Sequence, residues 1–187
     1  MFEKYNLLAG EEDAELIKRI KNNGVDIVFI LNPSEEIQLA AVKQDEGDNI
    51  IYITNPTEKV QLAAIRKNPF NIAYINNPSE TVQLAAVKKN AAAIMCIHNP
   101  SEEVQLAAIR KSGSVLSFIH NPTEEVQLTA VKRKPKDIEY IHNPTEEVVR
   151  YLIENYRNDI IVMWHLYAKV DFNTLPDDLK LLLEIGG

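Results

Sequence analysis

The sequence predicts an all-α solenoid, a stack of short helix-turn-helix repeats of about 22 residues each. Three observations predict it: an Asn-Pro pair recurs at a nearly constant spacing, an apolar helical segment follows each pair, and a second, shorter apolar segment completes each repeat. The pairs begin at Asn32, Asn55, Asn77, Asn99, Asn121 and Asn143. A single helix pair cannot bury its apolar side chains alone, so we expect consecutive repeats to stack.

The first segment of each repeat, such as NPSEEVQLAAIRK at 99–111, has the features of an α-helix of about three turns. We expect Asn99 to cap this helix, Pro100 to occupy its first position and Glu102 its third, as in a capping box. The equivalent glutamates are Glu35, Glu58, Glu80, Glu124 and Glu146. Apolar residues cover most of the circumference, which predicts a helix packed on several sides.

A turn leads to the second segment, which places two apolar residues three positions apart, as at Ile50 and Ile53. The turns contain Gly24, Gly47, Pro69, Gly113 or Pro135, and the expected caps are Asp26, Asn49, Asn71 and Asp137. The spacing predicts a two-turn α- or 3₁₀-helix. A short strand is the alternative, because the segment is rich in β-branched residues.

The repeats predict one α-solenoid domain over residues 1–187. Residues 10–31 carry a charged first helix and are expected to form an N-terminal capping unit. Residues 32–142 form five regular repeats, and 143–164 form a divergent one. Residues 165–187 are expected to be a C-terminal cap that ends in a helix after Pro176.

Charge and composition favour a cytoplasmic protein. The formal net charge of −7 gives no general attraction to nucleic acid or to an anionic membrane. Cys96 is the one cysteine of the sequence, so no intramolecular disulfide can form, which fits a reducing compartment. The sequence shows neither a signal peptide nor an apolar run of the ~18 residues that a membrane span needs.

No motif in the sequence predicts catalysis. It contains no phosphate-binding loop, dinucleotide fingerprint, zinc-protease helix, nucleophile elbow or CxxC pair. Helix capping explains the repeated glutamates, and Cys96 occupies a column that otherwise holds aromatic residues. We therefore expect a protein without enzyme activity, cofactor or metal.

Two polar columns recur. The first holds Gln38, Gln61, Gln83, Gln105 and Gln127. We expect each amide to bond the backbone of a neighbouring repeat or the next glutamine, the alternative being a row of amides that faces a peptide or base edge. The second holds His98, His120 and His142. Equivalent side chains of stacked repeats start ~8–10 Å apart, so these histidines form a ladder and not a metal cage. They are expected to tie the corner before the Asn-Pro pair, or else to form a pH-sensitive binding edge.

Candidate protein-binding residues lie in columns that vary between repeats and in the histidine column. They are Tyr52, Tyr74, Met95, Phe118, Tyr140, His98, His120 and His142. The scaffold accounts for the invariant columns, so variation marks positions that are free to differ. Aromatic side chains among varied polar ones are typical of protein recognition. The alternative is that the aromatic rings are buried between repeats.

Basic residues at the helix ends form a second candidate surface. They are Arg66, Lys67, Lys88, Lys89, Arg110, Lys111, Lys132 and Arg133. Parallel stacking would align them in a ribbon that binds a nucleic acid, a nucleotide or another anion. The alternative is a solvated surface that complements the helix dipoles.

The phrase NP(S/T)EEVQLAAV, followed by a short apolar helix, resembles an uncharacterised tandem-repeat family of bacteriophage and bacterial proteins. The resemblance is close over 32–142 and looser over 10–31 and 143–164. It extends more distantly to leucine-rich variant repeats, which pair an α-helix with a 3₁₀-helix, and to HEAT-like solenoids. It implies an α-solenoid without an established activity, and a phage origin would imply inhibition of a host protein or capture of a host signalling molecule.

The function expected from these features is non-catalytic binding, with a repeat-built surface presented to a protein partner. Binding of anions or nucleic acid through the basic ribbon is the alternative. A small-molecule pocket between solenoid ends in an oligomer is a third possibility, and stacking across molecules would produce a homodimer. No membrane partner is expected.

Overall fold

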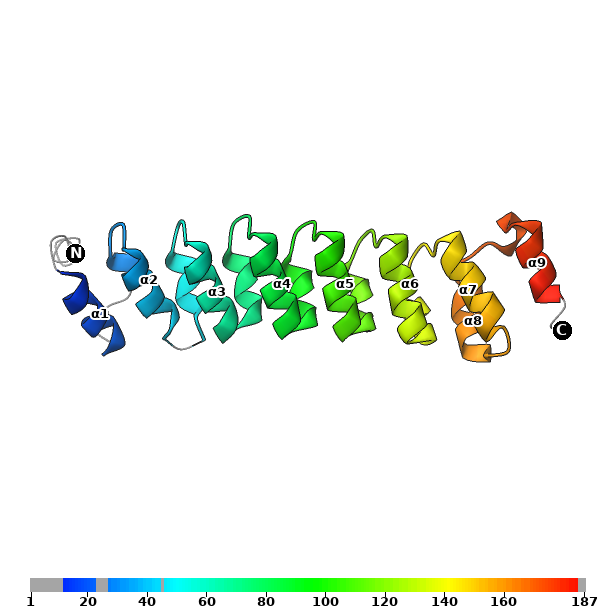
Figure 1. Ribbon diagram of the computed structural model, residues 1–187, viewed down its shortest axis with the longest axis horizontal. Helices are drawn as coiled ribbons and strands as arrows, with labels where there is room; N and C mark the ends of the chain where they lie inside the picture. Colours follow the sequence, from blue (N-terminus) through cyan, green and yellow to red (C-terminus); the bar gives the residue numbers. More distant parts are fainter. Residues whose placement is uncertain (1–11, 23–26, 45, 185–187) are drawn as a thin grey trace. The chain divides into compact units, whose positions relative to one another are not determined.

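The computed structural model describes residues 12–22, 27–44 and 46–184. Every regular element in these ranges is helical, and successive pairs of an α-helix and a 3₁₀-helix pack on one another (Figure 1). The protein is therefore an all-α repeat solenoid. The chain divides into two compact units, Met1–His98 and Asn99–Gly187, so that the unit boundary falls at the start of a repeat.

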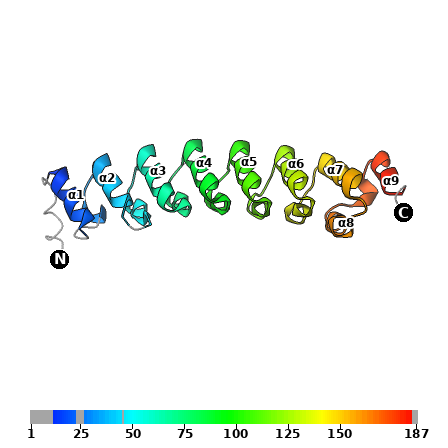
Figure 2. The same cartoon turned by 60° about the horizontal axis from the view of Figure 1, so that its bottom comes forward.

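The α-helices of the first unit are α1 (Asp13–Lys21), α2 (Glu35–Val42), α3 (Glu58–Lys67) and α4 (Glu80–Lys89), and its 3₁₀-helices are η2 (Ile27–Phe29), η3 (Asp48–Tyr52), η4 (Pro69–Tyr74) and η5 (Ala91–Cys96). The second unit contains α5 (Glu102–Lys111), α6 (Glu124–Arg133), α7 (Glu146–Tyr156), α8 (Ile160–Tyr167) and α9 (Asp177–Glu184), with η6 (Gly113–Phe118), η7 (Pro135–Tyr140) and η8 (Phe172–Thr174). Within each unit the α-helices lie side by side, and the 3₁₀-helices form a second layer (Figure 2). We call this second layer, η2–η5 in the first unit and η6, η7 and α8 in the second, the 3₁₀ layer.

The spacing of apolar residues explains why the second element is a 3₁₀-helix. A 3₁₀-helix has three residues per turn, so positions i and i+3 point the same way. Ile50 and Ile53 are both buried, as are Ile72 and Ile75 in the next repeat. The short-strand alternative is therefore wrong for these segments.

The α-helices bury one face and leave another half-exposed. In α3, Val60, Ala64 and Ile65 are buried, whereas Leu62 and Ala63 are only half-buried. The prediction of a helix enclosed on most sides is wrong for this second face, because the described helices form two layers and none of them covers this face of the α-helices.

The helix caps differ from the sequence prediction. The N-cap is the serine or threonine two residues after the asparagine, as in α4, where Ser79 Oγ accepts a hydrogen bond from Val82 N at 3.4 Å. Glu80 is therefore the first helical residue and not the third, and there is no capping box. Asn77 instead turns the corner into the helix with a φ of 49°, a left-handed conformation that asparagine tolerates better than most residues.

The cap hydroxyls also connect consecutive repeats. Thr57 Oγ1 donates to Glu35 Oε2, and Ser79 Oγ donates to Glu58 Oε2, each at 2.6 Å. Lys59 adds an ion pair to Glu35 at 2.8 Å, and the hydrogen bonds from Lys59 and Thr57 lower the pKa of the Glu35 carboxyl. Each of these hydroxyls thus accepts within its own helix and donates to the helix before it.

We predict that Ser79→Ala lowers the free energy of unfolding by about 1 kcal/mol, because it removes both the cap of α4 and the hydrogen bond to Glu58. Urea denaturation followed by circular dichroism measures this change. Thr81→Ala is the matched control, since Thr81 is exposed on the same helix and alanine has the higher helix propensity. An equal loss in both variants would contradict the double role of the cap.

The predicted caps of the second element are wrong as well. Asn68 Oδ1 accepts from Phe70 N and Asn90 Oδ1 from Ala92 N, each at 3.0 Å, so the cap precedes the expected position by three residues. Asn71 and Asp137 are instead buried inside η4 and η7. The turn residue Gly24 and the expected cap Asp26 lie outside the described residues.

The divergent repeat departs from the pattern in two ways. Its second element, α8, is an α-helix, and it runs to Tyr167, so the predicted boundary at residue 164 falls inside it. Arg150 replaces the leucine of earlier repeats and joins the last helices, with distances of 2.6 Å from Nη1 to Asp178 Oδ2 and 3.1 Å from Nη2 to Glu146 Oε1. The Arg150 guanidinium holds the pKa of the Asp178 carboxyl below its usual value.

Candidate protein-binding face

Exposed large apolar side chains gather on the 3₁₀ layer. Those of the first unit are Val28, Phe29, Ile51, Tyr52, Phe70, Tyr74 and Met95, and those of the second are Phe118, Ile160, Ile161, Trp164 and Tyr167. Outside this layer only Leu31, directly after η2, and Leu181 of α9 are comparably exposed within the described residues. The described parts of α1–α7 expose none. The two layers therefore have different surface chemistry.

The 3₁₀ geometry places these side chains outward. In η3 the inward positions are Ile50 and Ile53, and the two residues between them are Ile51 and Tyr52. With three residues per turn, a pair at i and i+3 leaves i+1 and i+2 on the other side of the helix. Ile51 is 52% exposed and Tyr52 is 55% exposed.

Most of the aromatic candidates lie on the surface. Tyr52, Tyr74 and Phe118 are exposed, so burial between repeats is wrong for these three rings, and Met95 is exposed as well. Tyr140 is half-buried. A hydrogen bond with Glu139 raises the pKa of the Tyr140 phenol.

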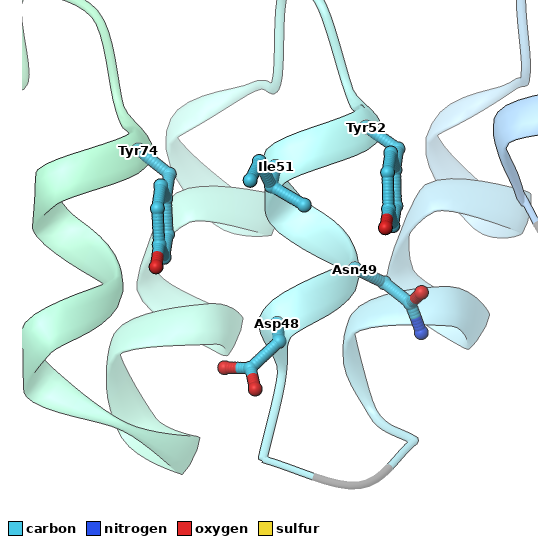
Figure 3. A pocket seen from close by; sticks show the side chains of 5 residues that line it. All are labelled: Asp48, Asn49, Ile51, Tyr52 and Tyr74. Atoms are coloured by element: carbon cyan, nitrogen blue, oxygen red, sulfur yellow. The ribbon is translucent and has the colours of Figure 1, made fainter.

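Two of the exposed tyrosines flank a hollow in the first unit. Tyr52 of η3 and Tyr74 of η4 lie on either side of Ile51, and Asp48 and Asn49 lie below these three residues in the view of Figure 3. The hollow has a volume of about 300 Å³. The sequence analysis identified the two tyrosines and missed Asp48, which shares η3 with Tyr52 and comes near Tyr74 only because η3 and η4 pack together.

The three histidines are exposed and line hollows at the Asn-Pro corners. His120 and His142 share one of about 120 Å³ with Tyr140, and His98 lines another of about 420 Å³ in the first unit. None of the three makes a hydrogen bond with a residue that the structure describes, so the predicted tie across the corner is absent there.

The glutamine column supports the corner from within each repeat. Gln61 Nε2 donates to Pro56 O at 2.9 Å, and the same bond recurs at Gln38, Gln83, Gln105 and Gln127. Gln127 also bonds the next repeat, accepting from Thr145 N at 3.1 Å. The prediction of a structural role is right, but the predicted partner in a neighbouring repeat is found for Gln127 alone among the described residues, since all five amides donate inside their own repeat. These side chains brace the backbone, and Gln38, Gln83 and Gln127 also line hollows at the Asn-Pro corners.

The basic ribbon is exposed but partly engaged with the scaffold. Its members Arg66, Lys67, Lys88, Lys89, Arg110, Lys111, Lys132 and Arg133 all lie on the surface. Lys89 Nζ donates to Arg66 O and Lys67 O, and Arg133 donates to Ile109 O and Lys111 O. These carbonyls end the preceding α-helix, where backbone acceptors lack a helical partner. Lys132 Nζ lies 5.7 Å from the centroid of the Tyr151 ring.

Catalytic and metal chemistry finds no support in the described chain. Burial raises the pKa of the Cys96 thiol, which favours its unreactive neutral form. Among the residues that the structure describes, no three histidine, cysteine, aspartate or glutamate side chains cluster closely enough to hold a metal ion. None of the helices in that part of the chain is both long and apolar enough to cross a bilayer.

Sequence reasoning missed the exposed face of α8. Ile160 is 84% exposed and Trp164 is 66% exposed, with Ile161 and Tyr167 beside them on the helix. The signal was the segment IIVMWHLY, which is apolar except for His165 and contains more apolar residues than one buried face requires.

Comparison with known proteins adds no relative: no protein-family model, no curated protein and no solved structure matches the chain. The resemblance to phage repeat proteins therefore stays a prediction. The argument for function depends on the surface chemistry of the two layers.

Proposed function

We propose that the protein is a non-catalytic binding protein and that its 3₁₀ layer is the surface that a protein partner contacts. The observation that carries this proposal is the segregation of exposed large apolar side chains onto that layer in both units. Exposed apolar patches with polar surroundings mark sites of protein association in soluble proteins. Tyrosine and tryptophan are the residue types that most often dominate binding energy.

The repeat architecture supports the same proposal. Each of the 3₁₀-helices η2–η7 is held by a buried pair of isoleucines, or of a leucine and an isoleucine, so its outward residues start from a fixed backbone. A partner that binds a preorganised surface loses less conformational entropy than one that must order a loop. Columns that vary between repeats would then determine which partner fits.

Anion or nucleic-acid binding by the basic ribbon is the second proposal. The exposure of its eight side chains favours it. The hydrogen bonds from Lys89 and Arg133 to the ends of the preceding helices weaken this proposal, because they give two of the eight basic side chains a structural role. The net charge of −7 also opposes long-range attraction of polyanions.

Affinity capture from a bacterial lysate at low and high salt tests the two proposals. We compare the unmodified protein with Tyr52→Ser/Tyr74→Ser, which removes two exposed rings from the 3₁₀ layer. The matched control is Glu36→Ser/Thr81→Ser, which changes two exposed residues on α2 and α4 of the same unit. These helices belong to the layer formed by α1–α7, which we call the α-layer. A third variant, Arg66→Glu/Arg110→Glu, reverses two ribbon charges without touching Lys89 or Arg133.

We expect one protein to be retained at ~0.5 M salt, where the Debye length is only a few ångströms. Its retention should fall at least tenfold in the tyrosine variant, by loss of about 1.4 kcal/mol or more, and not in the control. Retention that is indifferent to the tyrosines would contradict the proposal. Nucleic acid that is retained at low salt and lost in the arginine variant would favour the ribbon instead.

The biological setting is proposed from the resemblance alone. A cytoplasmic, phage-encoded inhibitor of a host protein fits a small binding protein built from near-identical repeats. Association of two copies through exposed apolar residues of the 3₁₀ layer is a further possibility, and sedimentation of the unmodified protein measures it directly.

A further inference from the structure

The hollow between η3 and η4 combines features that the rest of the 3₁₀ layer of the first unit does not repeat. Two tyrosine rings form its sides, Ile51 lies between them, and the Asp48 carboxylate lies near its lower end (Figure 3). The repeat equivalents of Asp48 in η4 and η5 are Phe70 and Ala92, and the equivalent of Tyr74 in η5 is Cys96. An acidic group therefore meets two rings at η3 and not at the next two 3₁₀-helices.

The shape suits a flat group that inserts between the rings. Tyr52 and Tyr74 are 55% and 49% exposed and come from consecutive 3₁₀-helices. Consecutive packed helices lie ~8–10 Å apart. A planar group between two such rings contacts each face at about 4.0–4.5 Å. Ile51, itself half-exposed, would pack against the aliphatic part of the same side chain.

The charge of the hollow selects a cation. Asp48 is exposed, and its carboxylate makes no ion pair with any residue that the structure describes. Aromatic faces attract cations as well, and arginine stacks on them more often than lysine does. A purely apolar group would bring no partner for Asp48 and would partly dehydrate it, which costs free energy.

We propose that this hollow binds an arginine side chain of the protein partner, with the guanidinium between the two rings and an ion pair to Asp48. The inference rests on the proposed function, because it takes the 3₁₀ layer to be the docking surface. It goes beyond that function by naming the chemistry of one contact. The partner would carry an exposed arginine at the centre of a surface or segment that contacts η3 and η4.

Nuclear magnetic resonance titration with two small probes tests the proposal on the full chain. The probes are Nα-acetyl-arginine methylamide and its citrulline analogue, which has nearly the same shape and no charge. Labelled tyrosine rings report binding at Tyr52 and Tyr74. We expect saturable shifts with arginine at millimolar concentration, and affinity for citrulline at least about threefold lower.

Variants assign the effect to the hollow. Asp48→Asn should weaken arginine about threefold and leave citrulline unchanged, and Tyr74→Leu should weaken arginine by a similar factor. Glu36→Gln, an exposed acid of the α-layer, is the control and should change neither. Circular dichroism and the unfolding midpoint verify that each variant is folded.

Equal binding of the two probes, or no saturable shift at the two rings, overturns the proposal. The capture experiment separates this failure from that of the proposed function. If the tyrosine variant still loses the partner while the probes bind equally, the 3₁₀ layer remains the docking surface without an arginine contact. If arginine binds here and capture is indifferent to the tyrosines, the site exists and the proposed function fails.

Discussion

Gly113→Ala is expected to destabilise the second unit by about 3 kcal/mol. A Cβ at this position would lie 1.6 Å from Asp137 Oδ2 and 2.5 Å from its Cγ. Asp137 is only 2% exposed and cannot move aside without disturbing η7. The backbone of Gly113 does not require glycine, since its φ lies outside the left-handed range. The cost is therefore steric.

The chain offers its own control for this contact. Two pairs of the first unit are equivalent: Gly47 with Asn71 again sets a glycine against a polar side chain, whereas Pro69 with Ala93 sets a larger residue against a smaller one. Gly113→Ala/Asp137→Ala should accordingly recover most of the lost stability. Urea denaturation with hydrogen exchange of peptides from η6 and η7 measures both variants. A loss below about 0.5 kcal/mol in the single variant would show that Asp137 rotates freely, against the packing described above.

The second large effect on the free energy of unfolding is expected from substitutions at Asn71 and Asp137, the two buried polar residues of the 3₁₀ layer. Asn71 Nδ2 donates to Glu46 O at 3.1 Å and to Ala64 O at 3.4 Å. Asn71→Asp replaces this donor with a buried carboxylate that faces carbonyl oxygens, which should cost about 2–3 kcal/mol at pH 7. The reverse change, Asp137→Asn, should stabilise the second unit by about 1 kcal/mol.

The pH dependence gives an independent check. Burial raises the pKa of the Asp137 carboxyl above its ordinary value of 3.8, more than the nearby Lys134 lowers it. The folded state therefore holds this proton more tightly than the unfolded state does. The contribution of Asp137 to stability is most favourable below the ordinary pKa, and it falls as the pH rises to the raised pKa.

Unfolding midpoints at pH 4 and pH 7.5 measure the difference between the parent and Asp137→Asn. The advantage of asparagine should be small at the lower pH and full at the higher one. An advantage that does not change with pH would mean that Asp137 titrates normally in the folded protein. Asn71→Asp should show the matching pattern, with a smaller loss at pH 4.

The fold followed from the sequence because two periods coincide in it. The Asn-Pro repeat defines the unit, and the three-residue spacing of pairs such as Ile50 and Ile53 defines the second element. The N-cap residues could not be predicted from the sequence, because asparagine, serine and threonine are all good N-caps and the asparagine lies only two residues before the serine or threonine. Only the backbone shows that Asn77 has a positive φ and that Ser79 begins the helix.

The candidate site followed only in part. Variation between repeats identified Tyr52 and Tyr74, but their exposure depends on which side of the second element faces the α-layer. Asp48 could not be selected, because it is one acidic residue among many until η3 and η4 bring it beside both rings. The α8 face was missed because the candidate residues were chosen by comparing equivalent columns of the repeats, and α8 lies partly in the divergent repeat and partly beyond it.

The hydrogen bonds from each cap hydroxyl to a carboxylate of the preceding helix have a consequence for how the number of repeats can change. In each linked pair the later repeat supplies the hydroxyl and the earlier one the carboxylate, so a duplicated repeat brings both halves of the contact with it. In α1 the carboxylate is that of Asp13, which accepts a hydrogen bond from Ser34. In α7 the N-cap residue Thr145 makes no side-chain capping hydrogen bond. Repeat number can thus change by unequal recombination without a new interface, and the length of the repeat-built surface changes with it.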